Sequence, residues 1–130
     1  MIVDTSAVRA ILFGEPEAVE FTELLSGTDR NFMSALNWLE AGMVVESEWG
    51  AQGTAQMHAL MEKGQIDVVA FDASLAEIAL DAWRRYGKGR HPAGLNFGDC
   101  AAYALAKLTR RPLLFKGGDF ALTDIVPAAE

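Results

Sequence analysis

The stretch Met1-Ile2-Val3-Asp4-Thr5-Ser6-Ala7 shows the pattern on which the whole chain is built. Its three apolar residues predict a short strand, and the three polar residues that follow are types that commonly cap helices. The same order of strand, cap and helix recurs where Asn31-Phe32-Met33 precedes Ser34, and where the β-branched stretch 66–71 precedes Asp72. Strands that alternate with helices in this way predict an α/β fold with a parallel sheet.

The remaining elements follow from apolar periodicity and from the positions of glycine and proline. We expect one domain over residues 1–130, with a central parallel sheet of four to five short strands and helices on both faces. Right-handed crossovers would place the carboxyl end of every strand at one edge of the sheet, where such folds bind ligands. The further strands are expected at 112–115 and 125–126, and the helices at 7–13, 16–27, 34–48, 51–63, from 72 or 74 to 87, and 96–108.

Composition limits the class of protein. Of the 130 residues, 51% are hydrophobic and 22% are charged, so the chain can form a core and is not intrinsically disordered. The single cysteine, Cys100, excludes an intramolecular disulfide. No apolar run approaches the roughly 18 residues that a membrane span needs, and the opening residues lack the basic region of a signal peptide. We therefore expect a cytoplasmic protein that does not bind a membrane.

Acidic residues are expected to gather at the carboxyl edge of the sheet. Asp4 follows the first strand, and Asp119 follows the strand at 112–115. Asp99 lies in the first turn of the last long helix, where the helix dipole favours an anion. Glu40 falls on the inner side of the third helix. Each aspartate also has a structural alternative, because aspartate caps helices, complements helix dipoles and occupies turns.

Glu40 interrupts an apolar helix face. Its neighbours at helical spacing are Leu36, Leu39 and Met43, which predict that this face is buried. An acid on a buried face is costly unless a cation or a hydrogen-bond donor pairs with it. Glu40 is therefore harder to explain by structure alone than the three aspartates.

Four carboxylates at one edge repel each other, so a cation is needed to neutralise them. Carboxylate oxygens are the ligands that Mg²⁺ and Mn²⁺ prefer, and such an ion can activate water and neutralise a phosphodiester. Other chemistries lack their motifs: there is no Gly-rich nucleotide loop or serine-hydrolase elbow, and His58 and His91 have no zinc-ligand spacing. We therefore expect Mg²⁺ or Mn²⁺ as the cofactor.

The charge is unevenly distributed along the chain. A net charge of −7 argues against nucleic-acid binding, yet residues 84–111 contain seven basic residues and a single acid, Asp99. This asymmetry predicts a surface that faces a polyanion, with a solvated basic loop as the alternative. The candidates for contact with a phosphate backbone are Arg84, Arg85, Lys88, Arg90 and, outside this segment, Lys116.

Four stretches resemble the motifs of the PIN domain family, and they occur in the family's order. The first is the opening stretch quoted above. The second is Ser34-Ala35-Leu36-Asn37-Trp38-Leu39-Glu40. The third, which is the most specific of the four, is Leu95-Asn96-Phe97-Gly98-Asp99-Cys100-Ala101-Ala102-Tyr103-Ala104-Leu105-Ala106, and the fourth is Leu113-Leu114-Phe115-Lys116-Gly117-Gly118-Asp119-Phe120 with Thr123-Asp124-Ile125. Within the family the chain most resembles the VapC-type toxins of bacterial toxin–antitoxin pairs.

The resemblance implies a Mg²⁺- or Mn²⁺-dependent endoribonuclease with Asp4, Glu40, Asp99 and Asp119 as its catalytic acids. Asp4 and Asp99 are the expected direct metal ligands. The family also implies an RNA substrate, a homodimer, and a VapB-type antitoxin that inserts a basic residue into the acidic site. The residues that could support the acids are Thr5, Ser6 and Asp124, although Asp124 fits a helix cap better.

Other functions remain open from the sequence. The same acids would serve an RNA-processing nuclease that is not a toxin, or a non-catalytic domain that binds a metal or a partner. A receiver domain or an aspartate-nucleophile phosphatase is less consistent, because Thr5 and Ser6 stand where those proteins need a second acid.

The third helix carries more apolar residues than one buried face can hold. Some of them should therefore be exposed, and an exposed apolar patch usually marks an interface, most often that of a twofold dimer. The residues concerned are Leu36, Trp38, Met43, Val45 and Trp49.

Overall fold

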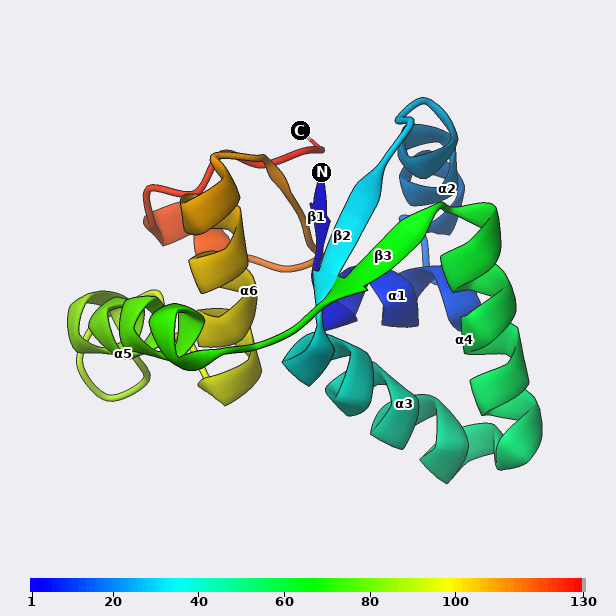
Figure 1. Cartoon of the computed structure of the whole chain (residues 1–130), viewed down its shortest axis with the longest axis horizontal. Helices are drawn as coiled ribbons and strands as arrows, with labels where there is room; N and C mark the ends of the chain where they lie inside the picture. The colour runs from blue at the N-terminus through cyan, green and yellow to red at the C-terminus, as the bar shows by residue number, and fades with distance from the viewer. Residues whose placement is uncertain (130) are drawn as a thin grey trace.

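The chain folds around a parallel sheet (Figure 1). The structure is a computed structural model that describes residues 1–129. The strand order is β3-β2-β1-β4, so the first strand of the chain lies inside the sheet, and all pairings are parallel. The strands of the described residues are β1 (Ile2–Val3), β2 (Asn31–Ser34), β3 (Ile66–Val69) and β4 (Leu113–Leu114).

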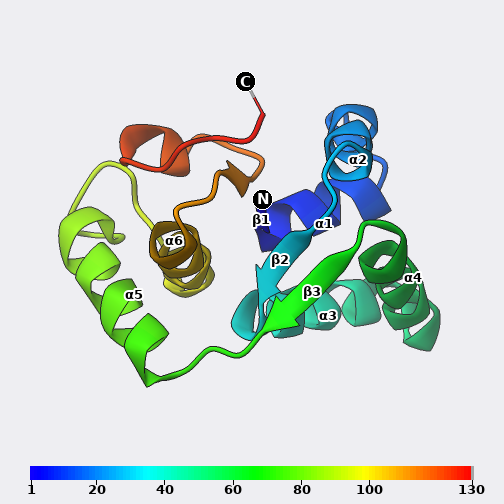
Figure 2. The same cartoon turned by 45° about the horizontal axis from the view of Figure 1, so that its top comes forward.

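Helices cover both faces of the sheet, as the sequence predicts (Figure 2). The first four helices share one hydrophobic core with the sheet, and the last two share another. β1 contributes to both cores, because Ile2 packs with the last two helices and Val3 packs with the first four. The helices are α1 (Thr5–Leu12), α2 (Ala18–Ser26), α3 (Ala35–Trp49), α4 (Ala51–Lys63), α5 (Ala73–Tyr86) and α6 (Phe97–Thr109), and a short 3₁₀ helix spans Phe120–Leu122.

The fifth strand that the sequence predicts at 125–126 does not form. Leu113 instead makes a single parallel bridge to Pro127, and its N–H donates to the carbonyl oxygen of Val126 over 2.9 Å. The N–H of Ala128 also donates to the carbonyl oxygen of Leu113 over 2.9 Å, so both hydrogen bonds of this bridge form, but no second bridge follows it among the described residues. Over residues 1–129 the sheet therefore has four strands, the lower of the two numbers expected.

The buried face of α3 is not the one that the apolar stripe predicts. The buried residues are Asn37, Ala41 and Val45, whereas Leu39 is 52% exposed and Met43 is 64% exposed. Both faces have helical spacing, and α3 turns the one with smaller residues towards the rest of the fold. The prediction that this stripe forms core is therefore wrong for Leu39 and Met43, whereas Leu36 is half-buried.

Polar caps bring helix N-termini to the carboxyl ends of the strands. Asp4 follows β1 and caps α1, and Ser34 ends β2 and caps α3. Asp72 caps α5, accepting from the N–H of Leu75 over 3.0 Å. Asn96 caps α6, as the sequence predicts. The partial positive charge of helix N-termini is therefore concentrated at one edge of the sheet.

Among residues 1–129, the structure contains no helix with both the length and the apolar character needed to cross a membrane.

Candidate functional site

A pocket of about 280 Å³ lies where β1, α1, α3 and α6 meet. All four predicted acids line it. They come from four separate segments of the chain, which the parallel topology brings to the same edge. The lining residues are Asp4, Thr5, Ser6, Arg9, Glu40, Val44, Asn96, Asp99, Lys116, Asp119 and Phe120.

Asp4 is the most deeply placed of these acids, and its side chain is only 3% exposed. Its Oδ2 accepts hydrogen bonds from the N–H of Ser6 over 3.0 Å and from Ser6 Oγ over 2.6 Å. Its Oδ1 is buried and has no hydrogen-bond partner among the described residues. Asp4 thus caps α1 through Oδ2 only. The capping alternative does not explain why the second oxygen, Oδ1, is buried without a hydrogen-bond donor.

Burial raises the pKa of Asp4 to about 7, because a charged carboxylate is poorly solvated there. The hydrogen bonds from Ser6 act in the opposite direction, and the charges of Asp99 and Glu40 raise the pKa further. Near neutral pH this carboxyl is therefore poised between its neutral and charged forms. A cation in the pocket would favour the charged form.

Asp99 shares the same electrostatic environment from the first turn of α6. It forms a capping box with Asn96: its N–H donates to Asn96 Oδ1 over 2.9 Å, and its Oδ2 accepts from the Asn96 N–H over 3.0 Å. Burial raises the pKa of Asp99 to about 6, and the charges of Asp119 and Glu40 add to this rise. Asp99 is both a cap and a member of a repelling cluster of acids.

The remaining two acids approach the pocket from α3 and from the loop after β4. Glu40 is half-buried, and Oε1 accepts a short hydrogen bond from the hydroxyl of Thr5. Asp119 is exposed and begins the short 3₁₀ helix without a side-chain capping bond. The turn alternative for Asp119 fits its backbone position, but its side chain still lines the acidic pocket.

Thr5 and Ser6 each contact one of the acids. Ser6 Oγ donates to Asp4 and accepts from the backbone N–H of Lys116 over 3.0 Å, so it connects α1 to the chain after β4. Thr5 makes the corresponding contact to Glu40. Both hydroxyls therefore orient carboxylates that line the pocket.

Two cations line the acidic pocket, and one of them is already paired. The Nζ of Lys116 lies 2.8 Å from Glu15 Oε2 and 3.4 Å from Glu17 Oε1, which compensate its charge. Arg9 is exposed and forms no ion pair within residues 1–129. Arg9 is not among the site residues predicted from the sequence, although it follows Ser6 by three residues and so shares its helix face.

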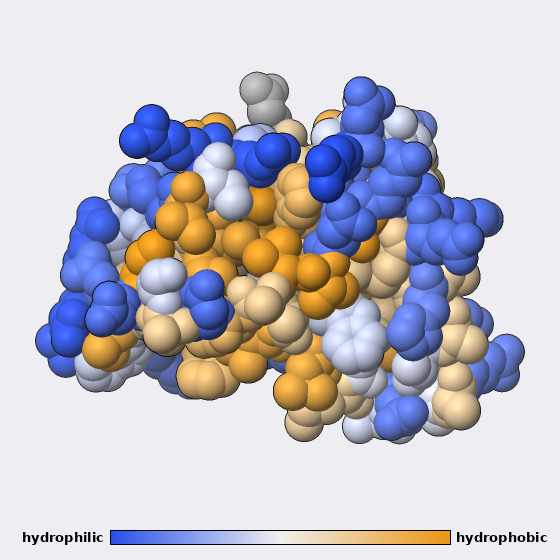
Figure 3. Space-filling model, viewed as in Figure 1, coloured by the Kyte–Doolittle hydropathy of each residue, from blue (hydrophilic) through white to orange (hydrophobic). Residues whose placement is uncertain are grey.

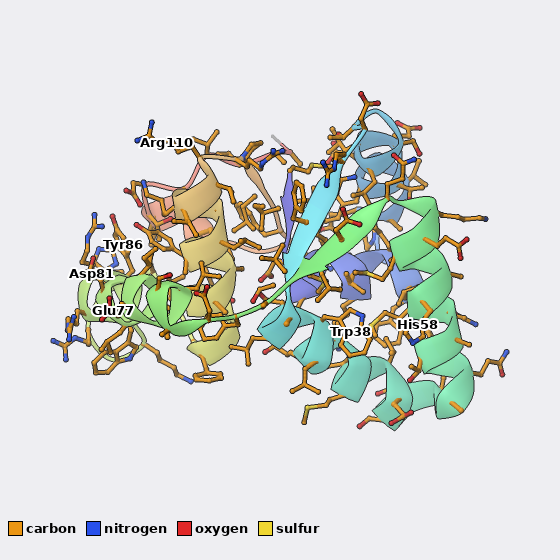
Figure 4. All side chains as sticks on the ribbon, in the orientation of Figure 1. Trp38, His58, Glu77, Asp81, Tyr86 and Arg110 are labelled. Atoms are coloured by element: carbon orange, nitrogen blue, oxygen red, sulfur yellow. The ribbon has the colours of Figure 1, made fainter. Side chains whose placement is uncertain are left out.

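The basic residues of the segment 84–111 do not line the pocket. Asp81 and Tyr86 lie on α5, on the opposite side of the molecule from α4 (Figure 4). The guanidinium of Arg85 lies 4.0 Å from Asp81 and stacks on the ring of Tyr86. The guanidinium of Arg90 lies 4.6 Å from the ring centroid of Trp83, which is also on α5. Asp99 lies within this segment, but its first basic residues, Arg84 and Arg85, lie in the last turn of α5, away from the edge where the acids meet (Figure 2). Arg84 and Lys88 are exposed there without lining the pocket.

Asp124 belongs to a different cluster and does not support the acidic site. It accepts from the hydroxyl of Tyr103 over 2.7 Å and from Lys107 Nζ over 2.9 Å. The guanidinium of Arg85 lies 3.9 Å away. These donors lower the pKa of Asp124 despite the opposing effect of its partial burial. The sequence placed Asp124 close to the fourth motif, but the chain turns away from the pocket before it reaches this residue.

The donor set of the pocket fits a hard divalent cation. Its acids offer only oxygen ligands, and the unpartnered Oδ1 of Asp4 is a buried acceptor that a cation would satisfy. Within residues 1–129 no three His, Cys, Asp or Glu side chains are gathered closely enough to hold an ion as they stand. A bound cation would therefore draw the carboxylates closer together, which their mutual repulsion opposes when no cation is present.

Comparison with known proteins gives the same family from a family model and from full-length relatives. The sequence matches the family model of the PIN domain over residues 1–126. Ribonuclease VapC30 of Mycobacterium tuberculosis is 43% identical over 129 residues, which cover 99% of this chain and 98% of the relative. Ribonuclease VapC of Mycolicibacterium smegmatis is 46% identical over 125 residues, which cover 96% and 97%.

Solved structures share the fold. The VapC20 toxin of Mycobacterium tuberculosis has a TM-score of 0.79 at 18% identity, covering 99% of this chain and 98% of that one. A toxin–antitoxin complex from Klebsiella pneumoniae has a TM-score of 0.72 at 21% identity, with the same coverage.

Replacing Asp4 with asparagine should stabilise the metal-free protein near neutral pH. The carboxyl titrates at 3.8 in the unfolded chain and at about 7 in the native state, so between these values only the native state keeps the proton. The stability that this group contributes is complete below pH 3.8 and is lost as the pH rises to about 7. Asp4→Asn should therefore raise the free energy of unfolding at pH 7.5 by on the order of 2–4 kcal/mol, with no gain near pH 4.

Urea denaturation in EDTA across this pH range measures the effect. Asp67→Asn is the matched control, since Asp67 is an exposed acid on β3 whose side chain is 62% accessible. It should change the stability by less than about 1 kcal/mol at every pH. If Asp4→Asn were less stable than the wild type throughout, the carboxylate would be serving as a helix cap alone.

Proposed function

Since this chain belongs to the PIN domain family, and within it to the VapC ribonucleases, we propose that it is a divalent-metal-dependent endoribonuclease and the toxin of a toxin–antitoxin pair. The observation that carries the proposal is the acidic pocket, in which Asp4 and Asp99 both have raised pKa values and Asp4 keeps a buried, unpartnered oxygen. A pocket of this kind is unfavourable for the apo protein and favourable for a cation with a phosphate ligand.

Asp4 and Asp99 are the residues that would hold Mg²⁺ or Mn²⁺, with Glu40 and Asp119 closing the site. When bound, such an ion lowers the pKa of its water and neutralises charge on the phosphodiester. The protein's own part is to orient the carboxylates. Ser6 holds Asp4, and Thr5 holds Glu40, through the hydrogen bonds of their hydroxyls.

The pH response of the site follows from the same groups. Asp4 and Asp99 must lose their protons to bind a cation, so metal binding releases protons and strengthens as the pH rises through about 6 and 7. The proposed nuclease is thus expected to need more metal at acidic pH than at neutral pH.

The substrate is proposed to be RNA held at the rim of the pocket. Arg9 is the cation best placed to contact a phosphate, because it lines the pocket and no described carboxylate compensates its charge. Arg84, Lys88 and Arg90 would contact more distant phosphates at the end of α5. Lys116 contributes less, since Glu15 and Glu17 hold its ammonium group.

The partner is proposed to be a VapB-type antitoxin that places a basic side chain in the acidic pocket. A guanidinium could satisfy the Asp4 oxygen that has no donor and could neutralise its neighbours, without supplying the open coordination sites of a metal ion. A solved toxin–antitoxin complex from Klebsiella pneumoniae shares the fold, so the fold is compatible with such a partner.

A homodimer is proposed through the apolar surface beside α3, α5 and α6. Apolar residues gather in the centre of the face shown in Figure 3 and extend to its lower edge, with polar residues above them and on both sides. A groove of about 440 Å³ contributes to this surface, with Leu80 47% exposed and Phe97 78% exposed in its lining. The exposed Leu39 and Met43 of α3 and the exposed Val68 of the edge strand β3 add to the apolar area. Exposed apolar residues gathered on one face usually mark an interaction surface.

Asp4→Asn and Asp99→Asn should each reduce metal-dependent RNA cleavage by about 100-fold or more, because each removes a charged ligand. Cleavage of labelled RNA with Mg²⁺ or Mn²⁺, and with excess EDTA, measures this. Asp67→Asn, at the exposed acid of β3, should keep wild-type activity. Full activity in EDTA, or an active Asp99→Asn protein, would contradict the metal-dependent mechanism.

Arg9→Gln should weaken RNA binding and reduce the slope of log affinity against log salt by about 0.7, the loss of one contact to single-stranded RNA. Fluorescence anisotropy in EDTA measures binding without cleavage. Arg30→Gln is the control, because Arg30 pairs with Asp67 on β3. Replacing Lys88 and Arg90 together tests the basic segment in the same assay. An unchanged slope for Arg9→Gln would mean that this side chain is only a solvated charge.

Light scattering at micromolar concentration should give the mass of a dimer. Leu80→Glu should give a folded monomer, since a charge in the groove cannot be buried without a partner. Val19→Glu is the matched control: Val19 is 71% exposed on α2, and the variant should remain a dimer. A wild-type protein with monomer mass at every concentration would rule the dimer out.

A further inference from the structure

One buried side chain connects the three helices that carry the acidic pocket. Asn37 lies in the first turn of α3 and is 0% exposed. Its Nδ2 donates to the carbonyl oxygen of Gly98 over 2.9 Å and to Thr5 Oγ1 over 3.3 Å. Gly98 directly precedes Asp99 on α6, and Thr5 directly follows Asp4 on α1. A single amide group therefore joins the elements that place three of the four acids.

The same amide sets the direction of the hydrogen bonds that reach Glu40. Because Asn37 donates to Thr5 Oγ1, the hydroxyl of Thr5 keeps its own hydrogen for donation. That hydroxyl contacts Glu40 Oε1 and also the backbone carbonyl of Asn37 at 3.2 Å. Hydrogen bonds linked in this way strengthen one another. Asn37 thus holds the Glu40 carboxylate indirectly, through Thr5.

Packing at Gly98 places the same carboxylate against α6. A Cβ atom at residue 98 would lie 2.5 Å from Oε1 of Glu40 and 2.6 Å from Oε2, so the glycine makes room for the acid. The bond from Asn37 to the Gly98 carbonyl holds the two helices at this close approach. The spacing between Glu40 and Asp99 therefore depends on a contact that Asn37 makes directly.

Stability alone does not explain an asparagine at this position. Asn37 Oδ1 is buried and has no hydrogen-bond partner among residues 1–129. A buried acceptor without a donor destabilises the folded state, and leucine would fill a similar volume without that cost. The gain from asparagine lies in the two hydrogen bonds that Nδ2 donates to the elements of the site.

We infer that Asn37 is a positioning residue, which sets the spacing of the Glu40 and Asp99 carboxylates and thereby the affinity of the pocket for a divalent cation. The inference rests on the proposed function only in taking Mg²⁺ or Mn²⁺ as the ligand. Side chains that orient metal ligands through hydrogen bonds typically change metal affinity by about 10- to 100-fold when they are lost.

Mn²⁺ binding to Asn37→Leu tests this role without requiring catalysis. Titration calorimetry, or the electron paramagnetic resonance signal of free Mn²⁺, should give an affinity at least about 10-fold below that of the wild type. The metal-free variant should still give a cooperative melting transition, which shows that it folds. In cleavage assays at subsaturating Mn²⁺, kcat should fall while KM for RNA stays the same, because the phosphate contacts are intact.

Asn31 provides a matched control at the opposite edge of the sheet. It is also 0% exposed, and its Nδ2 donates to the carbonyl oxygen of Gly64 over 2.8 Å. Asn31→Leu should destabilise the protein but keep wild-type Mn²⁺ affinity in the folded state. If Asn31→Leu weakened Mn²⁺ binding as much as Asn37→Leu does, general loosening of the fold would explain both, and the positioning role would be overturned.

A second variant keeps the test decisive if Asn37→Leu does not fold. Thr5→Val preserves shape and removes the hydroxyl between Asn37 and Glu40, so it should also weaken Mn²⁺ binding. If the folded Asn37→Leu protein bound Mn²⁺ with wild-type affinity, the positioning role would be overturned and the metal site would stand. If only Thr5→Val folds, wild-type Mn²⁺ affinity in that variant would have the same meaning. A wild-type protein that binds no Mn²⁺ would overturn the metal site and the positioning role together.

Discussion

The buried carboxylate of Asp4 is the constraint on which the rest of the site depends. Asp4 directly follows β1, which lies inside the sheet. The two residues of β1, Ile2 and Val3, are fully buried in the two cores and fix the position of Asp4. The carboxylate therefore cannot move to solvent without disturbing both cores. Burial raises its pKa to about 7, and one of its oxygens has no donor. The neighbouring elements compensate for only part of this cost.

Helix N-termini supply that partial compensation and also bring in more acids. α1, α3 and α6 each begin near the carboxyl edge of the sheet, where their dipoles favour negative charge. The same helices carry Glu40 and Asp99 to within electrostatic reach of Asp4, which raises its pKa further. Lys116 could have balanced the cluster, but Glu15 and Glu17 hold it. The local charge is thus suited to a mobile cation, and Asn37 supplies the uncharged framework around it.

The surface of α3 illustrates how an apolar pattern can identify a helix and still misplace its buried face. Leu39 and Met43 are exposed because α3 packs through Asn37, Ala41 and Val45, whose small or polar side chains allow a close approach. From α3 the apolar groove beside α5 and α6 is lined by Leu36, while Leu39 and Met43 lie exposed outside it. The exposed apolar residues of α3 are therefore better suited to contact with a second copy of the chain than to packing within one chain.

The alternation of strands, caps and helices determined the α/β class, the parallel sheet and the edge at which Asp4, Asp99 and Asp119 would meet, because these follow from local periodicity and chain direction. Only the tertiary structure decided which basic residues approach the acids: α5 carries Arg85 away, while α1 brings Arg9 to the rim. It also revealed Asn37, since an asparagine inside a helix has no distinctive pattern until its partners Gly98 and Thr5 are known. Contacts between residues far apart in sequence depend on how helices pack, and a single sequence records that packing only indirectly.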